Sequence, residues 1–429
     1  MNDINPLPYS ALLRDIEADP QICAKFSAQD VAAYHVDDPF KAVKAAIHFK
    51  DRNRPEVAIA ICQRVLEKFP KDVFALYESA INHVRLGQFV EASTFSRRAF
   101  ARDPGSFERR ILHADILAII GDHMALAPFE TADWAGSAQR NDLLLQRELA
   151  EYILHHPRET TVARYERDSD LFLAPDQVEK EIFEAVRQER PFALVRAADG
   201  EGAWAFQDMA SEARYGRLFD ANRREFLVDW FGDDALFDDA DFYRFVRETL
   251  AMIGEADIIG VPALSWVEHE YRILSRRGIP SCLNILLALG LIGDAAPPSD
   301  KKYCSSHIHM NLEHDGFFDR LAAAGRKVGL ITSFPGLADR LKAREFDVQI
   351  VHLVPGDSRN FWKDGAGRAQ CQYPDRVREV MSALDKADLR NHIFLIASGF
   401  VGKRYCLKVR ERGGIALDIG ALANVWGGK

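Results

Sequence analysis

One spacing recurs in the first third of the chain and constrains its fold more than any other feature. Pro104 follows Pro70 at the same interval at which Gly121 follows Gly87. Alanines repeat at this interval too: Ala46, Ala80 and Ala114, and again Ala58 and Ala92. Closely crossing helices need small side chains at their contact, and the turn between helices favours glycine. The interval, about 34 residues, predicts stacked helix pairs between about residues 37 and 130.

The clearest unit is HVRLGQFVEASTFSRRAFARDP, residues 83–104. It resembles the tetratricopeptide repeat, which has a Leu-Gly turn, a later alanine and a closing proline. One departure is Asn53, which stands where the next unit has Gly87. The resemblance implies a surface that binds a peptide or a partner protein, and the alternative is that so few repeats only cap the next domain.

The second half changes to short apolar runs separated by amphipathic segments, which is typical of a βαβ layer. This predicts a Rossmann-like α/β/α domain with a mostly parallel sheet after the all-α repeats. The candidate strands are 192–197, 257–261, 327–333, 348–354, 393–398 and 415–420. A chain of 429 residues also exceeds what one core usually supports. The expected organisation is a helical extension at 1–36, tetratricopeptide-like repeats at 37–150, a connector at 151–175 and the α/β domain at 176–429.

Two carboxylates, Asp199 and Glu201, follow the first expected strand on either side of a glycine. Carboxylates at i and i+2 can both reach a hard cation such as Mg²⁺ or Mn²⁺, which completes its shell with phosphate oxygens and water. The alternative is a solvated acidic turn or the acidic first turn of a helix.

Other strand ends carry serine and glycine, and ligands collect beyond the carboxyl ends of parallel strands. The residues expected to bind a ligand there are Ser333, Gly336, Ser398, Gly399 and Gly402. Backbone N–H groups at such turns favour a diphosphate, although a serine beside glycine is often only a helix cap. At the last strand end, Asp418 is expected to accept a hydrogen bond from a ribose or sugar hydroxyl.

The segments VRAADGEGAWAF, ADIIGVPALSW, KVGLITSFPGLADRL, VHLVPG and the closing IFLIASGFVGKRY through ALANVWGG resemble, in this order, the GT-D class of glycosyltransferases. The resemblance covers about residues 190–429. It implies that Asp199 and Glu201 form an Asp-x-Glu motif that binds Mn²⁺ or Mg²⁺ together with a nucleotide-sugar donor, for which a UDP-sugar is expected. Arg196 would meet a phosphate or buffer the two carboxylates. Ala197-Ala198 departs from the family pattern, which leaves the shape of the donor pocket open.

An inverting transfer also needs a general base near the acceptor hydroxyl. The candidates are Glu268 and Glu270 in SWVEHEYRIL, and His307 and His309 in CSSHIHMNLEHDG. The second segment is polar and is expected to form a loop over the active rim. His307 and His309 alternate as in a strand that presents two imidazoles to one face, which would suit a metal; the alternative is an ordinary hydrogen-bonded histidine.

The leading hypothesis is a cytoplasmic, metal-dependent glycosyltransferase whose repeats recruit a protein or glycan acceptor. The net charge of −9 and the pI near 5.8 give no basic field for nucleic acid. The start lacks the pattern of a secretory signal, and no apolar run is long enough to span a membrane. Two alternatives remain: an interaction scaffold with a degenerate nucleotide-sugar-binding domain, and a nucleotide-binding enzyme of another class.

Overall fold

The computed structural model describes residues 6–130, 139–205, 208–232, 234–294, 297–298, 300–356 and 370–428. The chain divides into two compact units. The first comprises Met1–Thr161 and Glu268–Arg276, and the second comprises Val162–Val267 and Arg277–Lys429. Among the described residues, no helix combines the length and the apolar character that crossing a lipid bilayer requires.

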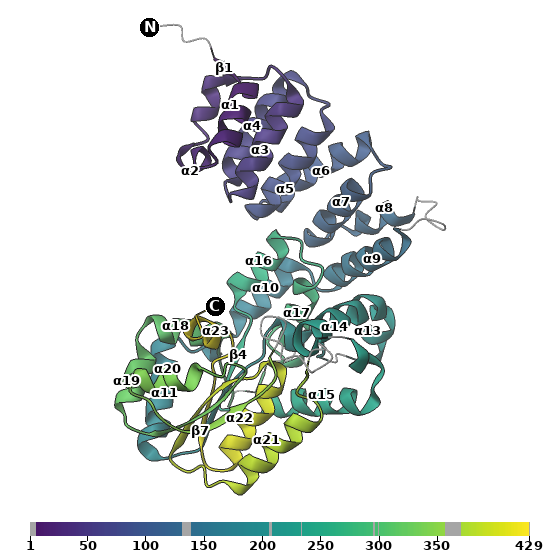
Figure 1. Ribbon diagram of the computed structural model, residues 1–429. Helices are drawn as coiled ribbons and strands as arrows, with labels where there is room; N and C mark the ends of the chain where they lie inside the picture. Colours follow the sequence, from purple (N-terminus) through teal and green to yellow (C-terminus); the bar gives the residue numbers. More distant parts are fainter. Residues whose placement is uncertain are drawn as a thin grey trace. The chain divides into compact units, whose positions relative to one another are not determined.

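The first unit is built almost entirely from helices (Figure 1). A short parallel pair, β1 (Leu7–Pro8) with β2 (Tyr34–His35), flanks its first helices. The helices are α1 (Tyr9–Ala18), α2 (Ile22–Lys25), η1 (Asp30–Ala33), α3 (Pro39–Asp51), α4 (Pro55–Lys68), α5 (Val73–Arg85), α6 (Phe89–Arg102), α7 (Phe107–Ile119), η2 (His123–Leu126), α8 (Ala127–Glu130) and α9 (Arg140–His155). The expected connector, 151–175, contains the end of α9, then α10 (Arg158–Arg167) and η3 (Ser169–Leu171).

The repeat is confirmed at both ends of its helices. Side chains of Asp38, Asp72 and Ser106, which recur at the repeat interval, accept backbone N–H bonds at the starts of α3, α5 and α7. Such caps satisfy N–H groups that the helix itself leaves unpaired. The repeated alanines are fully buried: Ala46, Ala80 and Ala114, with Ala58 and Ala92.

The turns that end the first helix of each pair share one backbone conformation. Gly87 and Gly121 have φ of +73° and +74°, and Asn53 at the same repeat position has φ of +57°. Asparagine tolerates the left-handed region better than most residues. Asn53 is therefore a conservative departure from the repeat, because it adopts the turn that glycine provides elsewhere.

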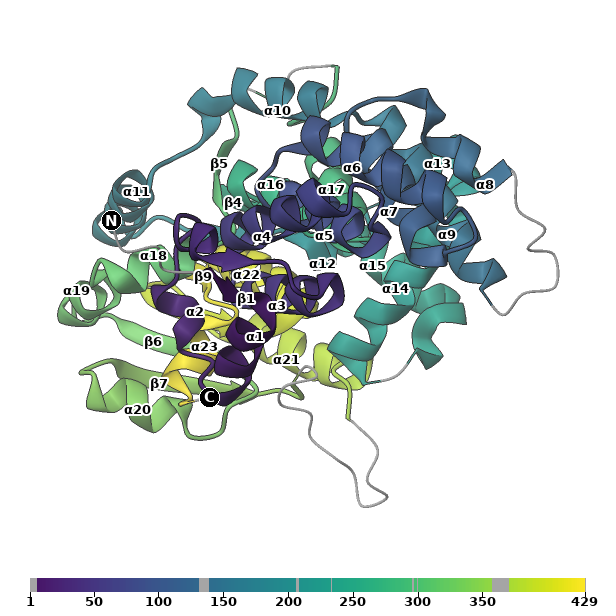
Figure 2. The same ribbon diagram turned by 90° about the horizontal axis from the view of Figure 1, so that it is seen from above.

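The second unit is an α/β domain around a seven-stranded sheet in which every pairing is parallel. The strands are β3 (Phe192–Arg196), β4 (Ile258–Val261), β5 (Lys302–Ser305), β6 (Lys327–Thr332), β7 (Asp347–Leu353), β8 (His392–Ala397) and β9 (Ile415–Asp418). Their order is β5-β4-β3-β9-β8-β6-β7, and Figure 2 labels β5, β4, β9, β6 and β7 in this sequence across the sheet. The last strand thus lies inside the sheet, paired with β3 and β8.

Helices cover both faces of this sheet (Figure 1). On one face, an apolar core joins the strands to α11 (Pro175–Gln188), α18 (Ile308–His314), α19 (Phe317–Ala323), α20 (Leu337–Ala343) and α23 (Leu422–Trp426). On the other, α22 (Gly402–Glu411) packs on β3, β8 and β9 and is covered by α15 (Ala240–Ile253) and α21 (Asp375–Lys386). The remaining elements are α12 (Asp199–Gly202), α13 (Met209–Arg214), α14 (Gly216–Phe231), η4 (Ala235–Asp238), α16 (Leu264–Arg272), α17 (Gly278–Ala288) and η5 (Gly399–Val401). The expected helical repeats and three-layer α/β architecture are confirmed.

Six of the seven strands match the ranges expected from the sequence. The exception is β5, whose sequence KYCS is short and begins and ends with a polar residue, so it lacks the apolar run of the others. The expectation of a loop after it is wrong, and so is the strand-like alternation of His307 and His309. The chain turns directly from β5 into α18, with His307 at the helix N-cap and His309 in its first turn.

Candidate functional site

A cavity of about 610 Å³ lies in the second unit at the carboxyl ends of the strands. Segments that follow all seven strands contribute to its lining, among them Asp199 after β3, Ser398 after β8 and Gly420 after β9. This edge is where α/β sheets of this kind bind their ligands, because the parallel strands deliver their connecting loops to one rim.

Arg196 is the last residue of β3, and its guanidinium is held on two sides. Its Nε donates to Asp418 at 3.3 Å, and its Nη1 donates to the Ser306 carbonyl at 2.9 Å and lies 3.0 Å from Nδ1 of His309. Among the described residues, Nη2 has no hydrogen-bond partner. Gly420 lies against it, since a Cβ there would stand 1.7 Å from Nη2. Arg196 is thus an oriented cation with a donor left for a ligand.

His309 supports this arginine as a neutral base. Burial and the neighbouring Arg196 lower the pKa of His309 to about 3. A neutral imidazole can accept the N–H of Arg196, whereas a protonated one would repel it. His307 lies at the rim, where its ring packs against Trp266 in a tilted arrangement with centroids 4.6 Å apart, and burial and Arg196 lower the pKa of His307 as well. Both predicted histidines line the cavity, but they face different partners.

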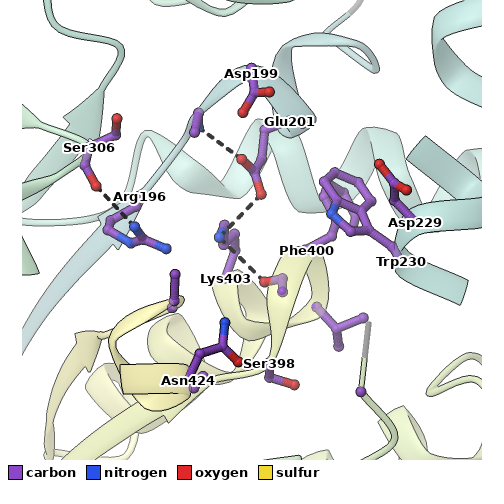
Figure 3. Close-up of a pocket in the computed structure, with 18 of the residues that line it drawn as sticks. Arg196, Asp199, Glu201, Asp229, Trp230, Ser306, Ser398, Phe400, Lys403 and Asn424 are labelled. Atoms are coloured by element: carbon purple, nitrogen blue, oxygen red, sulfur yellow. Dashed lines mark hydrogen bonds and ion pairs between the residues drawn. The ribbon is translucent and has the colours of Figure 1, made fainter. Parts of the chain in front are cut away.

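Lys403 and Glu201 form a buried ion pair at the cavity floor. The Lys403 ammonium lies 3.2 Å from Glu201, 2.9 Å from Asp418 and 3.3 Å from the Gly399 carbonyl. Figure 3 shows Lys403 between Arg196 and the Trp230–Phe400 pair, with its ammonium toward Glu201. Burial alone would lower the pKa of Lys403, but Asp418 and Glu201 raise it above its ordinary value.

Asp418 lies behind the cavity wall and is only 3% exposed. Its oxygens accept from Lys403 and from the side chain and backbone N–H of Arg196. Burial alone would raise the pKa of Asp418, but Lys403 and Arg196 outweigh it and hold the pKa at about 2. Its contacts are those of a counter-ion that orients the two cations.

The Asp-x-Glu segment is a short helical turn, α12, packed tightly against its surroundings. Glu201 accepts the backbone N–H of Ala198 at 2.8 Å, which caps the turn. The indole ring of Trp230 packs against Gly200, so close that a Cβ there would stand 2.2 Å from the ring. Gly202 contacts the Ser281 carbonyl at a distance that excludes a side chain. The segment therefore has a fixed shape, and Asp199 faces the cavity from its start.

The contacts of Glu201 do not fit the expected role of Asp199 and Glu201 as metal ligands. Both oxygens of Glu201 already have partners, the Ala198 N–H and the Lys403 ammonium. A divalent ion on Glu201 would stand next to a buried positive charge. Among the described residues, no three His, Cys, Asp or Glu side chains gather as a set that could hold a metal ion.

One wall of the cavity is aromatic and was not anticipated from the sequence. Trp230 stacks on Phe400 with ring centroids 5.2 Å apart. Beside them Arg277 pairs with Asp229 at 2.8 Å and lies 3.8 Å above the ring of Phe226. In the sequence these residues look like ordinary core and surface positions of helices. For Lys403 a signal does exist, because the strand-Ser-Gly-helix turn continues as GFVGK.

The remaining predicted residues divide between the cavity and other places. Ser333, Ser398 and Gly399 line the cavity, whereas Gly336 and Gly402 are not part of its lining. The Ser398 hydroxyl donates to the Gln372 side chain at 2.7 Å and does not cap the following helix. Glu268 and Glu270 belong to the first unit, and Glu268 is bound by Arg158 through two hydrogen bonds of 2.6 and 3.1 Å.

Comparisons with known proteins do not assign this chain to a family. No protein-family model and no curated protein matches the chain. Among solved structures, a mutant of the O-GlcNAc transferase of Thermobaculum terrenum aligns over 90% of this chain and 75% of its own, with 13% sequence identity and a TM-score of 0.25. A TM-score of this size does not establish a shared fold.

Proposed function

We propose that the second unit transfers a sugar from a nucleoside-diphosphate donor to an acceptor hydroxyl. The observation that carries the proposal is Arg196, an oriented cation that lines the cavity at the carboxyl edge of a parallel sheet and whose Nη2 has no hydrogen-bond partner among the described residues. A guanidinium fixed in this way suits a phosphate oxygen, because charge-assisted hydrogen bonds are strong where the donor is already oriented. The sugar comes from the resemblance of the Asp-x-Glu segment and the later strand ends to GT-D glycosyltransferases.

The turn after β8 supports the same anion. Ser398 and Gly399 lead through η5 into the ten-residue helix α22 and line the cavity with Arg196. Unpaired N–H groups and the helix dipole make such a start favourable for phosphate oxygens. The diphosphate would lie between this turn and Arg196.

The reaction that follows is a displacement at the anomeric carbon. The acceptor oxygen forms a bond to C1, the bond from C1 to the donor phosphate oxygen breaks, and the nucleoside diphosphate leaves with the electron pair. The acceptor proton needs a base at the cavity. His307 suits this role, because its lowered pKa keeps it neutral at pH 7 and it lies at the rim. Arg196 would stabilise the charge that develops on the leaving phosphate.

The repeats of the first unit would recruit the acceptor, a protein or a glycoprotein. Phe40 and Phe74 occupy the same position in successive repeats and are 67% and 53% exposed. Large apolar side chains exposed in register form a regular surface that suits a peptide segment.

Binding of UDP, followed by a panel of UDP-sugars and other nucleotide-sugars, tests the proposal. We expect UDP to raise the melting temperature of the full chain, and Arg196→Met to weaken UDP binding in calorimetry by about tenfold or more. Arg390→Met is the matched control, because that arginine is exposed and its side chain pairs, among the described residues, only with nearby Asp388. Release of UDP from one sugar donor would then identify the substrate. Absence of binding by every nucleotide, or equal binding by Arg196→Met, would refute the proposal.

A further inference from the structure

We infer that Lys403 is a built-in cation. Its ammonium pairs with Glu201 and takes the place of the metal ion that the Asp-x-Glu resemblance implies. The inference concerns Lys403, Glu201 and Asp418, three side chains that come from α22, α12 and β9. What the inference implies for the nucleotide-sugar donor rests on the proposed function. The implication is that a nucleoside diphosphate binds without a divalent ion at Glu201.

The Lys403 ammonium contacts three protein oxygens. It donates to Asp418 at 2.9 Å and to the Gly399 carbonyl at 3.3 Å, and it forms an ion pair with Glu201 at 3.2 Å. The residue is 3% exposed. Lys403 is therefore an internal counter-ion whose ammonium is paired with protein oxygens.

Glu201 is equally committed. It is 4% exposed, one oxygen accepts the Ala198 N–H, and the other faces Lys403. A divalent ion binds a carboxylate oxygen at about 2.1 Å. It would therefore compete for the oxygen that Lys403 contacts and lie within a few ångströms of the ammonium, where like charges repel strongly at low dielectric. Glu201 is a positioning residue, since it joins the start of α12 to α22.

This arrangement assigns separate tasks to the two cations. Lys403 neutralises Glu201 and shares Asp418 with Arg196. Because Asp418 and the Ser306 carbonyl hold the rest of the Arg196 guanidinium, its Nη2 is the donor that remains for the phosphate. Burying these three ion pairs in one network makes each charge dependent on the others.

Direct binding of Mn²⁺ alone tests Lys403 without any nucleotide. We expect electron paramagnetic resonance to show weak Mn²⁺ binding by the wild-type chain, unchanged in Glu201→Gln. Lys403→Met should bind Mn²⁺ about tenfold more tightly or better, because it frees the Glu201 oxygen that faces the ammonium, while Asp418 keeps its bonds to Arg196. Lys408→Met is the matched control on the same helix, since its partners Asp385 and Glu411 are mostly exposed. If Lys403→Met does not fold, the double variant Lys403→Met/Asp418→Asn removes one charge of each sign and still frees Glu201.

Tight Mn²⁺ binding by the wild-type chain that Glu201→Gln weakens tenfold would overturn the inference, and so would the absence of any gain when Lys403 is replaced. A second arm measures UDP binding by calorimetry with Mn²⁺ and with EDTA. We expect the two affinities to agree within about twofold, and UDP binding that needs Mn²⁺ and Glu201 would overturn the inference. If UDP binds under neither condition, the proposed function fails, and the Mn²⁺ arm still decides the role of Lys403.

Discussion

Replacing Gly420 by alanine tests the placement of Arg196 directly. Gly420 follows β9 with φ of +39°, and an added Cβ would stand 1.7 Å from Nη2 and 2.6 Å from Cζ of Arg196. These distances are far below van der Waals contact, so the guanidinium must move. Its hydrogen bonds to Asp418 and to the Ser306 carbonyl cannot survive that movement unchanged.

Two costs make up the expected loss of stability. Positive φ in a residue with a side chain costs about 1–2 kcal/mol. Weakening the hydrogen bonds of a largely buried arginine adds about 2–3 kcal/mol, because bonds to charged groups contribute about 1.5–3 kcal/mol each and one of these is long. We therefore expect Gly420→Ala to lower the free energy of unfolding by about 3–5 kcal/mol, and to weaken UDP binding by about tenfold to a hundredfold.

Urea unfolding and calorimetry with UDP measure the two effects. Gly399→Ala is the matched control for stability, because Gly399 has φ of +55° and, among the described residues beyond its chain neighbours, no heavy atom lies within 4 Å of an added Cβ. It carries the backbone strain alone, about 1–2 kcal/mol. If Gly420→Ala loses no more stability than Gly399→Ala and binds UDP as the wild type does, the assigned position of Arg196 is refuted.

Three further perturbations have expected outcomes. Gly202→Ala should lower the free energy of unfolding by about 3 kcal/mol or more, since its Cβ would stand 1.8 Å from the Ser281 carbonyl oxygen. Gly216→Ala is the control: among the described residues its added Cβ meets open space, so its free energy of unfolding should stay within about 1 kcal/mol of the wild type in the same urea titration. Equal losses would contradict the packing of α12. The pKa of Asp418 is about 2 in the folded chain against an ordinary value of 3.8, so its charge stabilises the fold by about 2 kcal/mol above pH ~4, and this contribution is lost as the pH falls toward 2. Asp418→Asn should remove this pH dependence, and an unchanged acid-unfolding profile would argue against the ion pairs. His309 resists protonation in the folded chain, with a pKa of about 3 against an ordinary 6.5, so the free energy of unfolding should fall as the pH drops below about 6.5. His309→Gln should flatten this dependence on pH in urea unfolding. A dependence that persists in the variant would show that other groups cause it.

The fold was largely accessible from the sequence because its signals are local. The repeat interval corresponds to helix caps at Asp38, Asp72 and Ser106, which act within one turn of the chain. Apolar runs mark strands that are buried on both faces of a parallel sheet. β5 escaped detection because a four-residue strand with polar ends has no such run.

The site was less accessible because its contacts join distant parts of the chain. Asp199, Glu201 and Arg196 stand together at the end of one strand, where the sequence motif reveals them, and all three line the cavity. A lysine at a helix start is typical of a solvated surface, and only the meeting of α22 with α12 buries Lys403 beside Glu201. His307 and His309 alternate in sequence, but the helix that begins between them sends one to Trp266 and the other to Arg196.

The position of β9 has a consequence for synthesis of the chain. β9 is the last strand to be made, yet it pairs with β3 on one side and β8 on the other. Until residues 415–418 leave the ribosome, the nascent domain consists of two partial sheets, each with an unpaired apolar edge. Such edges favour aggregation. A chain stopped before residue 415 should therefore sediment as aggregate, and one that stays dispersed and compact would show that the two partial sheets are stable apart.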